Sequence, residues 1–331
     1  MEQLARCWYR PCPWRFLLAP LSLVFLIVTL MRRWAYRLGW LRTARLSVPV
    51  VVVGNITAGG TGKTPLVIWL AERLKQAGYR PGIVSRGYGG RSRIATPVRP
   101  DSDSASVGDE PVLLARRTAC PVWVGRRRVE VAQQLLAFHP EVDVILADDG
   151  LQHYALGRDV ELVVIDGERG FGNGWLLPAG PLREPRSRLR SVDAVVVNGG
   201  QVLAPIAVPQ FGMTLVGDRF WQLGRPESSA GAGRFAGRVV QAVAGIGNPE
   251  RFFRKLRQLG IQIEAHARPD HHRYDVSGMP AGTVLMTEKD AVKCAGFDLP
   301  NAWALAVDAE VAPGLEKIIL ERIRRHGHQA H

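Results

Sequence analysis

The chain has 331 residues, of which 22% are charged and 47% are hydrophobic, and this composition excludes a disordered or fibrous protein. A net charge of +13 requires an anionic partner: nucleic acid, a membrane surface or a phosphorylated substrate. The length suits two lobes better than one. The cysteines show no CxxC pair and no metal-ligand spacing, and we expect all four to be reduced, cytosolic and structural: Cys7, Cys12, Cys120 and Cys294.

The first 48 residues carry over half of the excess charge, with eight arginines against one acid, Glu2. Four tryptophans accompany them, and the apolar run 16–31 lies between. Arginines and aromatic residues around an apolar run are typical of a membrane–water boundary, whereas nucleic-acid binders spread basic residues through a folded groove. We therefore expect a membrane surface as partner and no nucleic acid.

As a helix, the run 16–31 spans roughly 24 Å, which is short of a ~30 Å hydrocarbon core. It predicts a membrane anchor that either crosses with the help of snorkelling arginines or lies partly inserted from one side. A cleaved signal peptide fits less well, because Arg32 and Arg33 follow the run where a small-residue cleavage site would stand. A buried core helix is the third interpretation.

The next segment predicts a phosphate-binding loop. The apolar, β-branched run 48–53 indicates a buried strand, GNITAGGTGKT (54–64) follows it, and a helical pattern covers 66–76. We expect backbone N–H groups of the glycines to surround phosphates, Lys63 to reach the β/γ oxygens and Thr64 to bind Mg²⁺. The motif's first glycine is replaced by Thr57. The predicted ATP-binding set is Thr57, Ala58, Gly59, Gly60, Thr61, Gly62, Lys63 and Thr64.

The apolar segment 142–149 ends in two carboxylates, Asp148 and Asp149. An Asp pair after a strand is as often a simple turn, but in P-loop enzymes a carboxylate at this place holds Mg²⁺ or its water shell. With a P-loop upstream, both become candidate metal ligands. The sequence leaves open which of the two touches the metal directly.

Strands alternate with helices over 48–198, which predicts a P-loop NTPase-type parallel sheet with helices on both faces. We place an N-terminal membrane anchor at 1–47 and the kinase core at 48–198. A linker or β-ribbon follows at 199–234, and a second, smaller α/β lobe at 235–331, closed by a helix over 314–325.

Further motifs follow the P-loop in order: SRGYG (85–89), VGDEP (107–111), DDGLQH (148–153), LPAGPLRE (177–184), GIGNPE (245–250), DH (270–271) and TEKD (287–290). Together they resemble the tetraacyldisaccharide 4′-kinase family over nearly the whole chain. The resemblance implies an enzyme that uses ATP and Mg²⁺ to phosphorylate the 4′-hydroxyl of the tetraacyldisaccharide 1-phosphate in lipid A synthesis. It also implies a glycolipid partner and a location at the cytoplasmic face of the inner membrane.

The same resemblance makes Asp109, expected in a polar loop, the catalytic acid and His271 its partner. A carboxylate oriented by an imidazole can accept the proton of an attacking hydroxyl. His272 beside it leaves open which ring faces the site. Thr287 and Lys289 are expected to border the nucleotide. Asp290 directly follows Lys289, which does not fit the guanine-reading pattern and favours ATP over GTP.

Arginines suit anionic groups through their bidentate donors. Three are candidate clamps for the γ-phosphate or the lipid's 1-phosphate, and four other residues complete the predicted substrate site: Arg86, Arg128 and Arg183, with Tyr88, Glu110, Gln152 and His153. The main alternative is a membrane-associated regulatory P-loop ATPase. Such a switch has no need of a sugar site and would turn over ATP without a glycolipid.

Overall fold

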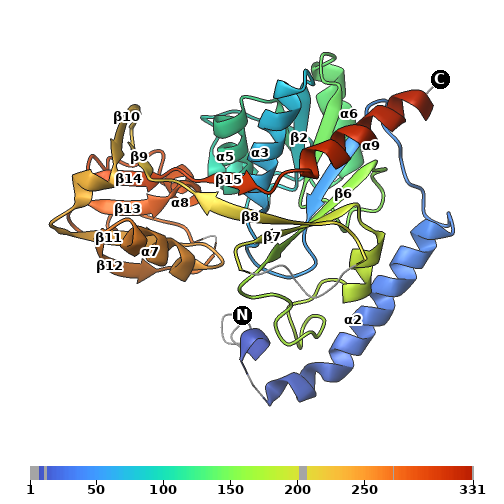
Figure 1. The fold of residues 1–331 in the computed structure, drawn as a ribbon, viewed down its shortest axis with the longest axis horizontal. Helices are drawn as coiled ribbons and strands as arrows, with labels where there is room; N and C mark the ends of the chain where they lie inside the picture. Colours follow the sequence, from blue (N-terminus) through green and yellow to red (C-terminus); the bar gives the residue numbers. More distant parts are fainter. Residues whose placement is uncertain (1–6, 11–12, 201–206, 271, 330–331) are drawn as a thin grey trace.

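The computed structural model describes residues 7–10, 13–200, 207–270 and 272–329, which form two sheets side by side (Figure 1). The larger sheet has nine strands in the order β15-β8-β7-β6-β1-β5-β2-β4-β3. Its inner strands are parallel, and only β3 and β15 run antiparallel to their neighbours. The strands are β1 (Val50–Gly54), β2 (Pro81–Ser85), β3 (Thr96–Val98), β4 (Val122–Val124), β5 (Val144–Asp148), β6 (Val160–Asp166), β7 (Ala194–Asn198), β8 (Gln210–Val216) and β15 (Asp308–Val311).

Helices cover both faces of this sheet because successive side chains of a strand point to opposite sides. Val51 and Val53 of β1 face the apolar cluster that includes residues of α3, α5 and α9, whereas Val50 and Val52 face the cluster that includes α6. The predicted parallel sheet with helices on both faces is thus confirmed. The helices are α3 (Lys63–Gln76), α4 (Ser104–Val107), α5 (Asp109–Thr118), α6 (Arg128–Phe138), the 3₁₀ helix η1 (Arg186–Ser191) and α9 (Leu315–Gln329).

The smaller sheet has six strands in the order β10-β9-β14-β13-β11-β12. Phe220, Phe235 and Trp303 meet edge to face in its core. The elements of this lobe are β9 (Arg219–Gln222), β10 (Arg225–Gly231), η2 (Ala232–Phe235), β11 (Val239–Ala244), α7 (Pro249–Gln258), β12 (Gln262–Ala267), β13 (Val284–Thr287), α8 (Glu288–Lys293) and β14 (Ala302–Leu305).

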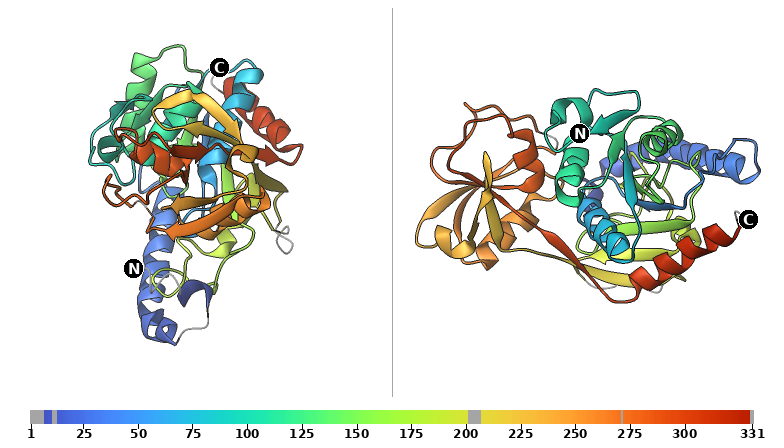
Figure 2. Two further views of the ribbon diagram at one scale, coloured as in Figure 1. Left: turned by 90° about the vertical axis from the view of Figure 1, so that its left-hand side faces the viewer. Right: turned by 90° about the horizontal axis from the view of Figure 1, so that it is seen from above.

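The chain passes between the lobes twice, which differs from the predicted division at 199–234 and 235–331. β8 joins the large sheet before β9 enters the small one, and β15 returns to pair antiparallel with β8 (Figure 2). The closing helix α9 follows it, and Leu315, Ile319 and Ile323 are buried in the core of the large sheet. A boundary drawn along the sequence misses this return because pairing between distant strands leaves no local pattern.

Helix α2 (Trp14–Arg37) contains the predicted apolar run and extends beyond it on both sides. It runs along the edge of the large lobe (Figure 1), with one face against the protein. The Ser22 hydroxyl donates to the Leu176 carbonyl at 2.9 Å and accepts from Ala179 N at 3.0 Å. Arg33 donates to Ser191 at 2.8 Å near the other end. The helix is long and apolar enough to cross a membrane, and most of it is not buried in the protein.

The outward face of α2 is apolar and exposed, and its members recur at helical spacing: Phe16, Leu17, Leu21, Leu23, Val24, Ile27, Val28, Met31 and Trp34. The prediction of four reduced cysteines is wrong in one respect, because Cys7 is disulfide-bonded. That prediction considered only CxxC and metal spacings, which do not detect such a bond. Cys120 and Cys294 are free thiols, as predicted.

Candidate active site

The loop between β1 and α3 has a left-handed backbone, which only glycine adopts easily, at two positions, Gly59 and Gly62. Gly62, which precedes α3, has φ +92°, and a Cβ built there would lie 2.2 Å from the Asn198 amide nitrogen. That amide donates to the Thr61 carbonyl at 2.9 Å, and the Asn55 amide donates to the Gly59 carbonyl at 3.3 Å. Both asparagines are buried, and they hold the loop in place from the ends of β1 and β7.

Sequence reasoning missed Asn55 and Asn198. Their only signal is a polar residue at the end of an apolar strand, and several other strands end that way. The loop is also paired on its outer side, where Thr57 forms a bridge with Leu182 and Ala58 N donates to the Pro181 carbonyl at 2.7 Å. These contacts bury Thr57 and Thr61 and leave the glycines facing the pocket.

The two acids at the end of β5, Asp148 and Asp149, occupy different environments although they are neighbours in the sequence. The Asp149 carboxylate accepts from Arg183 at 3.2 Å and lies 3.4 Å from the Lys63 ammonium. Burial opposes ionisation of Asp149, but Lys63 and Arg183 outweigh it and lower its pKa to about 2. The Asp148 side chain is fully buried and accepts from the Ser85 hydroxyl at 3.0 Å. Burial and the nearby Glu110 carboxylate raise the pKa of Asp148 to about 7, against the opposing effect of Lys63.

The chemistry of these groups fits a divalent cation. Asp148 Oδ1 is buried with no hydrogen-bond partner in the described structure, and the Thr64 side chain lines the same pocket as Asp149. Mg²⁺ binds oxygen ligands and often takes only one or two from the protein when phosphates supply others. In the described ranges no group of three or more His, Cys, Asp or Glu could enclose a metal alone. A metal here would therefore depend on the nucleotide and water for its remaining ligands.

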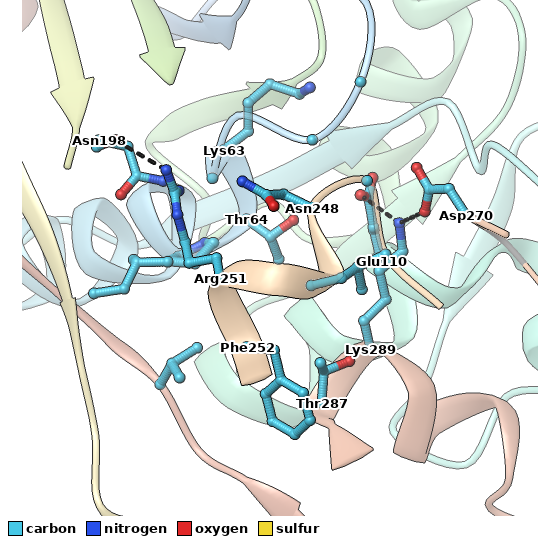
Figure 3. A pocket seen from close by; sticks show the side chains of 18 of the residues that line it. Lys63, Thr64, Glu110, Asn198, Asn248, Arg251, Phe252, Asp270, Thr287 and Lys289 are labelled. Atoms are coloured by element: carbon cyan, nitrogen blue, oxygen red, sulfur yellow. Dashed lines mark hydrogen bonds and ion pairs between the residues drawn. The ribbon is translucent and has the colours of Figure 1, made fainter. Parts of the chain in front are cut away.

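A pocket of about 1040 Å³ lies between the two lobes, with the phosphate-binding loop on one side and α7, α8 and the 269–270 segment on the other. Lys63 and Thr64 of α3 and Asn248 and Arg251 of the small lobe all line it (Figure 3). The predicted residues that line it are Ala58, Gly59, Gly60, Gly62, Lys63, Thr64, Tyr88, Glu110, Asp149, Arg183, Thr287 and Lys289. The phosphate-binding loop, the acids Asp149 and Glu110, and the second lobe thus line a single cavity.

Asp109 lies at the first position of α5 and is buried, not in the expected polar loop. Gly108, with φ +95°, turns the chain so that the helix begins at this acid. The Asp109 carboxylate lies 3.9 Å from the Lys289 ammonium and 3.8 Å from that of Lys293, both on α8 of the other lobe. Its predicted partner, His271, lies outside the described residues.

The Lys289 ammonium bridges the lobes, since it contacts Glu110 at 3.1 Å and Asp270 at 3.3 Å (Figure 3). Burial would lower the pKa of Lys289, but Glu110, Asp109 and Asp270 outweigh it and raise that pKa above its usual value. Thr287 caps α8 by accepting from Asp290 N at 3.2 Å.

Asp290 is fully buried and fixes the start of α8 in place. It accepts from Gly245 N at 3.0 Å, from the Tyr274 hydroxyl at 3.0 Å and from Lys293 at 2.8 Å. The 287–290 motif therefore places Thr287 and Lys289 at the pocket while Asp290 faces the core. Asp290 therefore stabilises the start of α8 and does not face the pocket, where it could contact a nucleotide base.

Four predicted substrate residues do not line the pocket: Arg86, Arg128, Gln152 and His153. Arg128 is buried, where its guanidinium donates to the Gly125 carbonyl at 2.6 Å, and burial lowers its pKa to about 10. Gln152 donates to the Asn55 carbonyl at 3.0 Å and to Glu184 at 2.8 Å. It therefore holds the loop after β5 against the phosphate-binding loop.

His153 is partly buried on that same loop. Burial and the positive charges of Arg128, Arg86 and Arg32 lower the pKa of His153 to about 4. The uncharged imidazole thus lies within a group of arginines that reaches from the core to α2. A positively charged region of this kind suits an anionic ligand beside the pocket.

Helix α7 supplies pocket residues that sequence reasoning did not assign. Arg251 donates to Asp166 at 2.9 Å, and Lys255 and Phe252 line the cavity beside it. The GIGNPE motif (245–250) marks the start of this helix and Arg251 follows it directly, but nothing in the motif indicates that Arg251 and Lys255 line the pocket. The second lobe therefore adds positive charge to the side of the pocket opposite the loop.

Comparison with known proteins shows which sequences and structures this chain resembles. The sequence profile described as tetraacyldisaccharide-1-P 4′-kinase matches residues 14–324. The tetraacyldisaccharide 4′-kinase of Methylobacillus flagellatus is 52% identical over 325 residues, covering 97% of this chain and 96% of that protein. The one from Chromobacterium violaceum is 50% identical, covering 99% and 100%. The fold is similar to a crystal structure of LpxK from Aquifex aeolicus in complex with ATP, with a TM-score of 0.80, 29% identity, and coverage of 94% and 99%.

Proposed function

The chain belongs to the tetraacyldisaccharide 4′-kinase family, and we propose here which of its residues carry out the family's reaction and how it meets its substrate. It is an ATP-dependent kinase of lipid A biosynthesis that phosphorylates the 4′-hydroxyl of the tetraacyldisaccharide 1-phosphate. The observation that supports the site best is the pocket lined by the phosphate-binding loop, Asp149 and Lys289, with Asp109 3.9 Å behind the Lys289 ammonium.

The phosphate-binding side of the proposal rests on Lys63 and Thr64. In-line phosphoryl transfer depends on positioning the γ-phosphate and neutralising its charge. Lys63, at the N-terminus of α3, supplies a cation and the loop supplies backbone N–H groups. Thr64 and Asp148, with Asp149 beside them, would hold Mg²⁺, which neutralises phosphate charge when bound.

The hydroxyl side rests on Asp109, which we propose as the base that accepts the proton of the sugar hydroxyl. Its carboxylate faces Lys289 and Lys293 from the other lobe, and both ammonium groups attract it and fix its position. Because these lysines come from α8, approach of the two lobes orients the base. His271 remains the proposed partner. Arg183 and Tyr88, which line the pocket, are the proposed contacts to the anionic sugar.

We further propose that α2 lies in the membrane interface and does not cross it. Its inner face is tied to the core through Ser22 and Arg33, so the helix cannot leave the protein to span a bilayer. Its outer apolar face would enter the headgroup–acyl boundary, as amphipathic interfacial helices do. This places the pocket beside a substrate whose acyl chains are in the bilayer. Because ATP is in the cytosol, the surface is the cytoplasmic face of the inner membrane.

The reaction is tested with labelled ATP and purified protein in detergent. With tetraacyldisaccharide 1-phosphate and Mg²⁺ we expect a labelled lipid, and chelation of the metal should abolish it. The control omits the lipid. ATP turnover that proceeds equally without lipid would support the regulatory ATPase and contradict the proposal.

A further inference from the structure

A second pocket, of about 280 Å³, lies where the C-terminal end of α2 meets the core. It shares no lining residue with the pocket between the lobes. Five arginines and a single carboxylate, Glu161, line it: Arg33 and Arg37 from α2, Arg45 from the segment after it, and Arg158 and Arg188 from the core. The chemistry of the lining is therefore that of an anion site.

The charges of this pocket divide into two groups. Arg158 and Arg188 are paired with Glu161, at 2.8 and 2.5 Å, and so build the floor. The other three arginines take part in none of the ion pairs found among the described residues, and of them only Arg33 has a polar side-chain contact there, with Ser191. Arg37 and Arg45 are exposed. Positive charge that folding does not neutralise is available to a ligand.

The position of the pocket beside α2 favours one class of anion, the phosphate groups of membrane lipids. Arg33 and Arg37 follow the apolar run of α2 within about two turns, and the pocket opens on the flank of a helix that presents its other face outward. A helix buried in the interface lies at the level of the phosphates. Tyr36 and Tyr154, whose ring centroids are 5.7 Å apart, add aromatic surface suited to that level.

We propose that this pocket binds the headgroup phosphate of an anionic phospholipid, at a site separate from the one that binds the sugar substrate. The proposal rests on the interfacial position of α2 proposed above. Bidentate arginine–phosphate contacts would hold the end of α2, and through Tyr154 the loop after β5, at a constant depth. A lipid headgroup and free inorganic phosphate would both present a phosphate group to the pocket, and the experiment below distinguishes these two ligands.

The test measures cosedimentation with vesicles of phosphatidylcholine alone and of phosphatidylcholine mixed equally with phosphatidylglycerol. The variant Arg37→Gln/Arg45→Gln removes two pocket charges, and the matched control Arg10→Gln/Arg42→Gln removes two exposed charges of the same N-terminal region outside the pocket. The quantity compared is the factor by which phosphatidylglycerol increases vesicle binding. If the arginines act only by diffuse attraction to the membrane surface, this factor falls by up to about 30-fold in each variant. We expect the pocket variant to lose at least about tenfold more than the control.

Equal losses in the two variants would overturn the proposal, because they would show only diffuse attraction. Release of the wild type from the mixed vesicles by millimolar inorganic phosphate, at constant ionic strength, would instead assign a free-anion site and also overturn it. Phosphorylation of detergent-dispersed substrate should be unchanged in the pocket variant, and a fall would assign the pocket to the sugar substrate. Binding to pure phosphatidylcholine vesicles measures the insertion of α2 without the contribution of anionic headgroups. If the wild type does not bind these vesicles, the membrane proposal itself is contradicted.

Discussion

The Lys63 ammonium lies 3.4 Å from the Asp149 carboxylate, so the lysine of the phosphate-binding loop is held by an acid from the adjacent strand end. Arg183 contacts the same carboxylate at 3.2 Å. An incoming phosphate must therefore compete with Asp149 for Lys63. The arrangement keeps a strongly charged site neutralised and leaves the lysine already positioned beside the loop.

Lys63→Ala should lower lipid phosphorylation by about 10²–10³, because it removes a cation that stabilises charge on the transferred phosphoryl group. Initial rates at saturating ATP and lipid measure this. Lys75→Ala is the matched control, since it removes a lysine from the other end of the same helix, where the side chain pairs with Glu72. Activity of Lys63→Ala within about tenfold of the wild type would contradict the assignment of the loop.

Asp148→Asn and Asp149→Asn should change stability in opposite directions. The pKa of Asp148 is raised to about 7, so its charged form costs stability, and that cost grows as the pH rises from about 4 to about 7. Without metal and nucleotide, Asp148→Asn should therefore raise the free energy of unfolding at pH 8 by about 1–3 kcal/mol. The gain should shrink toward pH 5.

The pKa of Asp149 is lowered to about 2, so its ion pairs contribute stability above about pH 4 that is lost as the pH falls toward 2. Asp149→Asn should therefore cost about 1–2 kcal/mol at pH 8. Denaturant unfolding followed by circular dichroism measures both variants. Shifts of the same sign at pH 8 would show that the two acids do not differ as described.

The phosphate-binding loop could be located from sequence because a buried strand, glycines and a helix occur together only in a few folds. The acids after β5 could be placed for the same reason, since the ends of parallel strands lie at one edge of a sheet. Arg128 could not, because nothing in an arginine-rich segment reveals which guanidinium is buried. Asn55 and Asn198 carry no motif, and their role follows only from the close approach at Gly62.

The fold of the second half was predictable as alternating strands and helices but not as a path between two lobes. β15 is a short strand with two exposed acids, Asp308 and Glu310, and resembles an edge strand of either sheet. Its partner β8 lies more than ninety residues earlier in the sequence. Only the three-dimensional pairing reveals that the chain closes the large sheet last.

Asp109→Asn should reduce the maximal rate by roughly 10²–10⁴ with little change in ATP affinity, because the amide keeps the shape and loses the proton acceptor. Steady-state kinetics and equilibrium nucleotide binding separate the two effects. Asp101→Asn, at an exposed acid just before the same segment, is the control. A similar loss of nucleotide affinity in Asp109→Asn would assign this acid to ATP binding.

The last prediction concerns the exposed face of α2. Removing the N-terminal region would also remove the contacts of Ser22 with Leu176 and Ala179, so a deletion cannot separate attachment from folding. Val24→Asp/Val28→Asp changes two outward residues, each 57% exposed, and leaves the docked face intact. Charges in the acyl boundary oppose insertion.

We expect this variant to lose vesicle binding and at least about tenfold of its activity on bilayer-embedded substrate, because each buried carboxylate costs one or more kcal/mol at the interface. Activity on detergent-dispersed substrate should stay near that of the wild type. Val239→Asp/Val276→Asp introduces the same charges at exposed valines of the small lobe and should change neither activity. Equal losses in vesicles and detergent would show that the outward face of α2 acts on the fold of the catalytic lobes and not on their attachment to the bilayer.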